Sequence, residues 1–123
     1  MPMKFMPKDS MPKPGMPSGA LAMLILRVLN SGPLHGYAIA QRIHVLSSEV
    51  LEVEEGSLYP ALQRLLKAKL VKAEWGVSST NRRVRTYQIT TSGLRHLEQQ
   101  ISSFERMFEG ITLVLKPSKS PST

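Results

Sequence analysis

The chain has 123 residues, a formal net charge of +7 and no cysteine. This length allows one domain with a modest core, and the lack of cysteine excludes disulfides and thiolate chemistry. No apolar run is long enough to span a membrane, so we expect neither a membrane span nor a signal peptide, and we expect a cytoplasmic protein.

The basic residues are concentrated in one segment. Between residues 64 and 95, eight Lys and Arg side chains stand against a single acid, Glu74, whereas residues 49–55 (EVLEVEE) are acidic. A basic domain can bind nucleic acid or an anionic membrane surface, or it can simply be basic. The separation of the two charges along the chain favours a surface that faces a polyanion.

The N-terminal segment has an unusual repeat, since Met-Pro recurs at positions 1, 6, 11 and 16. Proline this dense is incompatible with helix and sheet, so residues 1–18 are predicted to be a disordered tail. Its lysines would suit an arm that touches DNA phosphates, and its methionines would suit a thioether copper site. An unstructured leader is the plainer interpretation. Residues 116–123 are predicted to be a second, flexible tail.

Two helices are expected first in the body of the chain. Residues 19–32 (GALAMLILRVLNSG) predict a buried helix, because they are apolar almost all round and end in a glycine. Residues 32–36 (GPLHG) predict a turn. Residues 37–47 predict a second helix, followed by a connector over residues 48–56. The expected buried face of the second helix consists of Ile39, Ile43 and Leu46.

Residues 57–68 predict a third helix with two contrasting faces. At 100° per residue, one face is a core stripe formed by Leu58, Ala61, Leu62, Leu65 and Leu66. The opposite face contains no acid and consists of Ser57, Tyr59, Pro60, Gln63, Arg64 and Lys67. Ser57 is the expected N-cap, and Pro60 is expected in the first turn, where no internal donor is lost. Hydroxyls, an amide and cations suit phosphates and base edges. The alternative is an ordinary, well-started surface helix.

The rest of the chain predicts a hairpin and a long helix. Residues 70–78 and 84–90 alternate as two short strands, and their connection is polar and basic. Residues 90–115 predict a helix that is capped by Thr90 or Thr91. Its apolar residues follow steps of three and four, which is a heptad seam. Packing on the domain's own core is the alternative, but we expect a dimer contact through Leu94, Leu97, Ile101, Phe104, Phe108, Ile111 and Leu115.

Three helices followed by a basic hairpin is the order of a winged helix-turn-helix domain. The expected fold is therefore mainly α with a two-stranded β-hairpin. Residues 19–90 would form the DNA-binding domain, and residues 91–115 a dimerisation helix. In such domains the third helix enters the DNA major groove, and the hairpin, or wing, lies against the backbone or minor groove. The phosphates would be neutralised by Lys67, Arg82, Arg83 and Arg85.

Three motifs occur in order along the chain: LHGYAIAQRI, EEGSLYPALQRLLKAKLVKAEW and YQITTSG. With them the chain resembles the PadR family of bacterial transcriptional regulators over about residues 19–115, in the subgroup with one C-terminal helix. The resemblance implies a homodimeric winged-helix protein, usually a repressor, whose third helix reads DNA. It implies that Tyr37 approaches a phosphate and that the recognition residues are Ser57, Tyr59, Pro60, Gln63 and Arg64. The family wing often has Arg-Lys-Tyr-Tyr, whereas residues 84–87 are VRTY and lack one aromatic.

Repressors of this kind resemble switches that respond to a small molecule. An apolar or aromatic effector would bind at the dimer interface, between the first and last helices. Methionine and aromatic side chains adapt well to flat ligands, and the expected lining is Met23, Phe104, Met107 and Phe108. A plain dimer core is the alternative interpretation of the same residues.

No catalytic motif is present, so an enzyme is not expected. The chain lacks a cysteine nucleophile, a G-x-S-x-G elbow, a G-x-G-x-x-G loop and a P-loop. His35, His44 and His96 lie far apart without metal-ligand spacing, and no cofactor or metal is predicted. The rival functions are a winged-helix module for protein contacts and a nonspecific DNA-binding protein.

Overall fold

The computed structural model describes residue 16 and residues 19–116. The predicted tails, residues 1–18 and 116–123, therefore lie outside the described residues, except for Met16 and Lys116. In chain order the elements are α1 (Ala20–Leu29), β1 (Leu34–His35), α2 (Gly36–Leu46), α3 (Glu55–Lys67), β2 (Val71–Val77), β3 (Arg83–Ile89) and α4 (Thr91–Leu115). The fold is mainly α with a small antiparallel sheet, as predicted.

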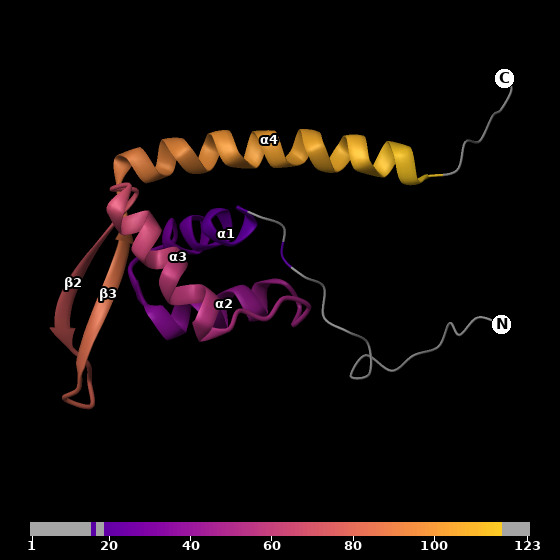
Figure 1. Ribbon diagram of the computed structural model, residues 1–123. Helices are drawn as coiled ribbons and strands as arrows, with labels where there is room; N and C mark the ends of the chain where they lie inside the picture. Colours follow the sequence, from indigo (N-terminus) through magenta and orange to yellow (C-terminus); the bar gives the residue numbers. More distant parts are fainter. Residues whose placement is uncertain (1–15, 17–18, 117–123) are drawn as a thin grey trace, which may run out of the picture.

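Helix α1 is the centre of the core. It contacts α2, α3, α4 and β3, and in Figure 1 it lies between α4 on one side and α2 and α3 on the other. Ile25, Leu26 and Leu29 have almost no exposed surface, because a helix that is apolar all round must be covered on every side. The predicted buried helix is confirmed, and it is the support on which the other helices are packed.

The sheet has three strands rather than two, in the order β1-β3-β2. The predicted hairpin is β2 and β3, which pair with Trp75 opposite Arg85 and Val77 opposite Arg83. The predicted turn at residues 32–36 is wrong in part, because Leu34 and His35 form β1 and pair with Tyr87 and Thr86 of β3. The partner strand is remote in the sequence, so the local pattern GPLHG carried no sign of it.

Helix α2 buries Ile39 and Ile43 as predicted, but Leu46 is 66 % exposed. The reason is the tight exit of the chain from α2, where the Ser47 hydroxyl oxygen accepts a hydrogen bond from the Leu51 backbone N–H at 3.0 Å. This bond folds the connector back, so that Leu51 and Val53 pack against the core in place of Leu46. The predicted position of Leu46 on the buried face is therefore corrected.

Thr90 joins the start of α4 to the end of α3. Its side-chain oxygen accepts from the Gly93 N–H at 3.0 Å, which confirms Thr90 as the cap. Its hydroxyl also donates to the Lys69 carbonyl at 2.8 Å, and its N–H donates to the Leu70 carbonyl at 3.0 Å. From this junction α4 crosses over α1 and continues past the rest of the domain (Figure 1).

Gly93 is required by this junction, which yields a first prediction. A Cβ at Gly93 would collide with the Leu70 carbonyl oxygen and lie 2.8 Å from the Ile89 Cγ1 atom. We expect Gly93→Ala to lower the free energy of unfolding by about 1–3 kcal/mol, as overpacking usually does. Urea unfolding followed by circular dichroism at one protein concentration measures the change.

The matched control is Gly56→Ala in helix α3, where a Cβ would meet no atom within 4 Å. This variant should gain about 0.5–1 kcal/mol from the better helix propensity of alanine. A Gly93→Ala variant that unfolds at the wild-type urea concentration would contradict the packing described for the Thr90 junction.

Candidate nucleic-acid interface

Helix α3 has the two faces that its sequence predicts. Leu58, Ala61, Leu62 and Leu65 are buried against the core. The outward residues are all exposed, namely Ser57, Tyr59, Pro60, Gln63, Arg64 and Lys67. Because the buried face is fixed by α1, the orientation of the outward face is fixed too.

The start of α3 differs from the prediction. The helix begins at Glu55 with Glu54 as N-cap, and no side chain caps it. The N–H groups of Ser57 and Leu58 already donate to the Glu54 carbonyl at 3.0 and 2.9 Å, so the predicted Ser57 cap is wrong. Pro60 consequently lies in the second turn, inside the helix. It has no N–H to donate to the Gly56 carbonyl four residues earlier.

The outward face is also not free of acid. Glu55 belongs to the first turn and lies four residues before Tyr59, which places the two side chains on the same side of the helix. Partial burial raises the pKa of Tyr59 above its ordinary value of 10.0, and the nearby Glu55 carboxylate and Tyr87 raise it further. The Tyr59 hydroxyl therefore stays protonated and can both donate and accept a hydrogen bond.

The ring of Tyr59 rests on the first residue of α2. A Cβ at Gly36 would lie 2.8 Å from both Cε1 and the hydroxyl oxygen of Tyr59. Only a glycine leaves room for this ring, which remains 40 % exposed. Tyr37, next in α2, is 58 % exposed. The structure thus brings Tyr37 and Tyr59 to the adjoining ends of α2 and α3.

The wing has an aromatic and cationic face that we did not predict. Strand pairing places Trp75, Arg83, Arg85 and Tyr87 on the same face of the sheet. The Arg83 Cζ atom lies 4.5 Å from the Trp75 ring centroid. The Arg85 Cζ atom lies 5.6 Å from that of Trp75 and 5.8 Å from that of Tyr87. The predicted strand ends, residues 78 and 84, would have paired Trp75 with Tyr87, so the sequence did not indicate this cluster.

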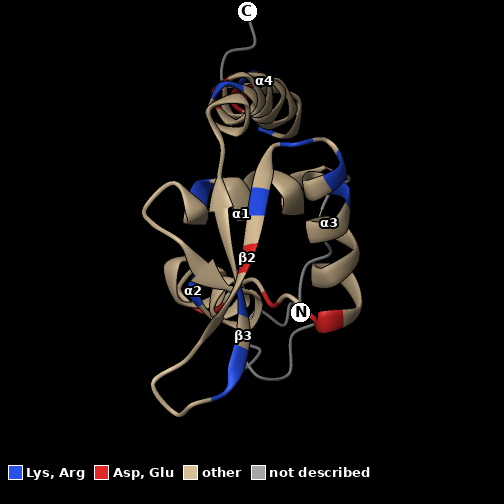
Figure 2. Ribbon diagram, turned by 90° about the vertical axis from the view of Figure 1, so that its left-hand side faces the viewer, with Lys and Arg blue, Asp and Glu red and all other residues tan. Residues whose placement is uncertain are grey.

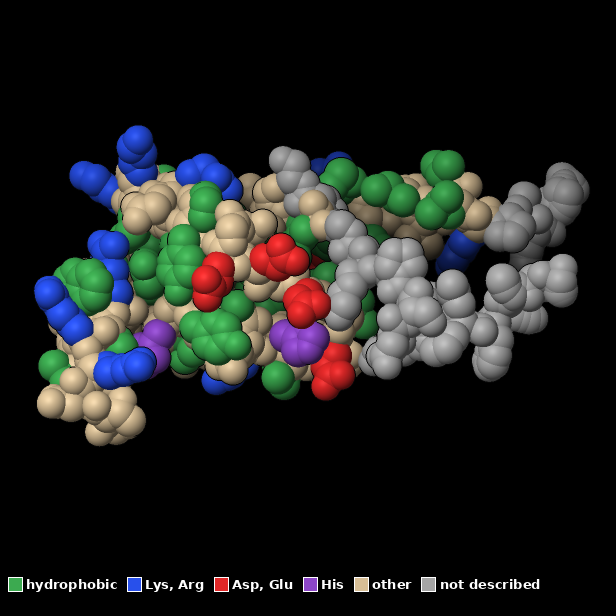
Figure 3. Space-filling view, turned by 60° about the horizontal axis from the view of Figure 1, so that its bottom comes forward, with side chains coloured by type: hydrophobic (Ala, Val, Ile, Leu, Met, Phe, Trp, Pro, Cys, Tyr) green, Lys and Arg blue, Asp and Glu red, His purple; other side chains and the backbone are tan. Residues whose placement is uncertain are grey.

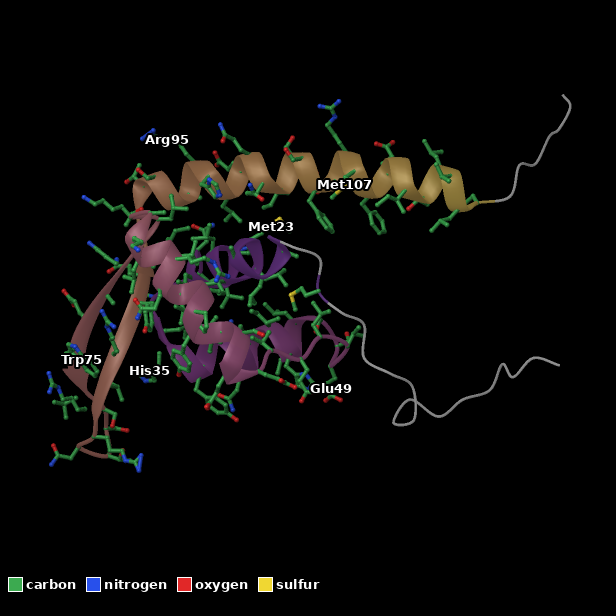
Figure 4. The ribbon with its side chains drawn as sticks, viewed as in Figure 1. Met23, His35, Glu49, Trp75, Arg95 and Met107 are labelled. Carbon is green, nitrogen blue, oxygen red and sulfur yellow. The ribbon has the colours of Figure 1, made fainter. Side chains whose placement is uncertain are left out.

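The remaining wing residues clarify how the wing is held. Tyr87 is 4 % exposed and belongs to the core cluster, so the aromatic residue that VRTY retains is the one that the core needs. Arg82 is exposed in the turn, where its N–H donates to the Ser78 hydroxyl oxygen at 3.2 Å. The Trp75 side chain extends from the outer part of the hairpin in Figure 4.

Helix α3 and the wing share one open groove of about 440 Å³. Its lining consists of Gln63, Arg64, Leu66, Lys67 and Arg85. No acid lines the groove, and the Nε atom of Arg85 is buried without a hydrogen-bond partner. A groove lined by three cations suits an anionic ligand.

The charges on this side of the molecule are separated. Figure 2 shows basic residues on both strands of the wing and at the end of α3, with an acidic residue on β2 and another at the opposite end of α3. Figure 3 shows basic side chains at the wing end of one face and acidic side chains grouped further along it. A polyanion would therefore be attracted to the wing end, where the groove lies.

The predicted dimer residues divide into two sets along α4. Leu97 is 2 % exposed, and Leu94, Ile101 and Phe104 pack against the core of the same chain. Leu97 has almost no surface left for a partner, so its assignment to a dimer contact is corrected to a core position. Phe108, Ile111 and Leu115 are 59, 49 and 76 % exposed.

Three of the four predicted effector residues line one small hollow. Met23, Phe104 and Met107 come together between the start of α1 and the middle of α4, with Gly19, Ala20, Gln100 and Ser103, around about 200 Å³. Figure 4 shows Met23 and Met107 on these two neighbouring helices. Phe108 does not line the hollow, and its ring instead stacks on Phe104 with centroids 6.1 Å apart.

No helix in residues 19–116 has the length and hydropathy of a membrane span. Within the same part of the chain, no three His, Asp or Glu side chains are grouped so that they could hold a metal ion.

The chain is similar to a known protein family and to several solved structures. Residues 25–99 match the model of the transcriptional regulator PadR-like family. A transcriptional regulator from Clostridium thermocellum is 30 % identical with a TM-score of 0.73, over 80 % of this chain and 95 % of that chain. A PadR-like transcriptional regulator from Bacillus cereus is 28 % identical with a TM-score of 0.69, over 81 % of this chain and 95 % of that chain.

A more distant structure, Bacillus subtilis PadR in complex with operator DNA, is 20 % identical with a TM-score of 0.61. The match covers 88 % of this chain and 52 % of that chain, and it shows a shared fold. The family match includes α2, α3, the wing and the first part of α4, which is more than half of the chain. The chain therefore belongs to the PadR-like family, whose members are transcriptional regulators and not enzymes.

Proposed function

We propose that the protein binds a specific double-stranded DNA operator as a homodimer and acts as a ligand-responsive repressor. The observation that carries the proposal is the shared groove, in which Arg64 and Lys67 of α3 meet Arg85 of the wing. A recognition helix and a wing that converge on one cationic groove can hold the two sides of a DNA groove at once. The Bacillus subtilis PadR of similar fold was solved with operator DNA, which supports this use of the fold.

In this proposal α3 enters the major groove with its exposed face toward the bases. Gln63 and Arg64 have the side chains that read adenine and guanine edges in pairs of hydrogen bonds. Ser57, Tyr59 and Pro60 lie nearer the start of α3 and would fit the helix against the groove wall. The phosphate contacts would come from Tyr37, Lys67, Arg82, Arg83 and Arg85, all of which have solvent-accessible side chains.

The homodimer rests on the second half of α4. This half projects past its own domain (Figure 1) and exposes Phe108, Ile111 and Leu115. An apolar hollow lies on the same part of the helix, lined by Met107, Gly110, Ile111, Val114 and Leu115. A second copy of α4 would cover these side chains and remove them from water.

The effector site is the hollow between α1 and α4. Its lining by Met23, Phe104 and Met107 suits an apolar or aromatic molecule. In the dimer this hollow would lie beside the α4 contact, so an effector bound there would change the spacing of the two recognition helices and release the operator.

The first test is DNA binding by the purified wild-type protein. Fluorescence anisotropy should show tight binding to DNA from upstream of its own operon and weak binding to unrelated DNA of equal length. If about six phosphates are neutralised, the logarithm of the association constant should fall against log salt with a slope near −5. Equal binding to both DNAs would favour a nonspecific DNA-binding protein, and no binding to either would favour a module for protein contacts.

A second test addresses the Tyr59 ring. Gly36→Ala puts a methyl group 2.8 Å from the far end of this ring, so the ring must move while the core stays in place. We expect operator affinity to fall about tenfold, as for loss of one contact worth about 1.4 kcal/mol, with little change in the melting temperature. Tyr59→Ala should weaken binding similarly. Wild-type affinity in both variants would show that the ring is not part of the interface.

A third test addresses the dimer by sedimentation velocity. Ile111→Asp should make the protein monomeric at concentrations where the wild type is dimeric, because the carboxylate would be buried against the partner helix. Ser102→Asp is the matched control, since position 102 lies on the opposite face of α4 at 100° per residue and is exposed. A monomeric wild type, or a dimeric Ile111→Asp variant, would contradict the proposed contact.

A further inference from the structure

We infer that Trp75 is a positioning residue of the DNA interface: its indole ring orders Arg83 and Arg85 on the wing before a DNA phosphate arrives. The inference rests on the proposed DNA-binding function and deepens it. It names the residue that orders the wing arginines before DNA binds, and this residue need not touch a base.

The Trp75 ring lies beside two arginines of β3. Trp75 is directly opposite Arg85 across the hairpin, and Arg83 lies diagonally from it on the same face. Both guanidinium groups come close to the ring, with Cζ to centroid distances of 4.5 Å for Arg83 and 5.6 Å for Arg85. These distances are within the range of cation–π attraction, for which tryptophan is the best ring.

The Trp75 ring is not part of the domain core. Trp75 is 58 % exposed, whereas Val71 and Tyr87 on the same face of the sheet are buried. A large aromatic side chain left in water at the outer part of a wing contributes little to the core. The Trp75 ring contacts Arg83 and Arg85, so we infer that it acts through these two side chains.

A guanidinium that is stacked on an aromatic ring can still bind a phosphate. A guanidinium that lies against a ring by its face keeps the N–H groups on its edge free for a phosphate. An unrestrained arginine loses much rotamer freedom when it binds, at a cost of about 0.5–1.5 kcal/mol for each side chain. Stacking on Trp75 removes part of that cost from the binding step, because the arginines are already ordered in the free protein.

Arg85 connects the wing to the exposed face of α3. Arg85 also lies 5.8 Å from the Tyr87 ring centroid, and Tyr87 is fixed in the core. The same Arg85 lines the groove with Gln63, Arg64 and Lys67. Held between Trp75 and Tyr87, Arg85 is thus placed to bind a phosphate together with Lys67 of α3.

The test compares operator affinity and salt dependence in full-length variants. Trp75→Ala should bind the operator about tenfold more weakly, with a salt slope close to that of the wild type, because the arginines still reach the phosphates after they are ordered. Trp75→Phe keeps a ring and should recover part of the loss. Val77→Ala is the matched control, since Val77 is on the same strand and face and is 68 % exposed; it should bind like the wild type.

A double-mutant cycle separates positioning from a direct or structural role. In an Arg83→Gln, Arg85→Gln background, Trp75→Ala should cause no further loss, because no arginine remains to be ordered. An equal loss in both backgrounds, or wild-type affinity in Trp75→Ala, would overturn the inference while leaving the DNA-binding proposal intact. A wild type that binds no DNA would overturn both.

A measurement on the free protein tests the stacking without DNA. Trp75 is the single tryptophan of the chain, so its fluorescence reports on this site alone. The emission should change when Arg83 and Arg85 are both replaced by glutamine, and should stay unchanged in Ser102→Asp. Identical emission spectra for the wild type and the arginine variant would overturn the inference.

Discussion

The packing of the Tyr87 ring, from the central strand β3 into the core, is the contact on which the rest of the structure depends. Tyr87 pairs with Leu34 of β1 on one side and with Ala73 of β2 on the other, and its ring lies in the core with the residues of α1 and α3. A hairpin on its own is marginally stable in water. Because its central strand is fixed to the helices through this ring, the wing keeps one orientation relative to the exposed face of α3.

Much of this arrangement could be predicted because it follows from local patterns. The all-round apolar α1, the leucine stripe of α3, the alternating strands and the Thr90 cap each depend on residues within a few positions of one another. Two features could not be predicted from these patterns. Strand β1 depends on remote partners, Tyr87 and Thr86. Leu46 is exposed because of a local side-chain bond, from the Leu51 N–H to the Ser47 hydroxyl oxygen, which hydrophobic periodicity does not reveal.

The candidate site shows the same division in finer detail. The periodicity of α3 identified its outward residues, but the start of the helix was placed two residues too late. That small shift concealed Glu55 on the outward face and moved Pro60 from the first turn to the second. Trp75 and Gly36 were missed because their importance lies in contacts with Arg83, Arg85 and Tyr59, which only the three-dimensional packing reveals. The heptad pattern likewise predicts an apolar face on α4. It does not predict that the domain's own core covers the first half of that face.

The Thr90 junction gives the molecule a mechanical property. Its side chain and backbone hold the Lys69 and Leu70 carbonyls, which directly follow the end of α3, and Gly93 allows α4 to start in close contact with the same segment. The long helix α4 is therefore attached, through its first turn, to the segment that ends α3. A rotation of α4 about its first turn must either break these hydrogen bonds or carry the end of α3 with it.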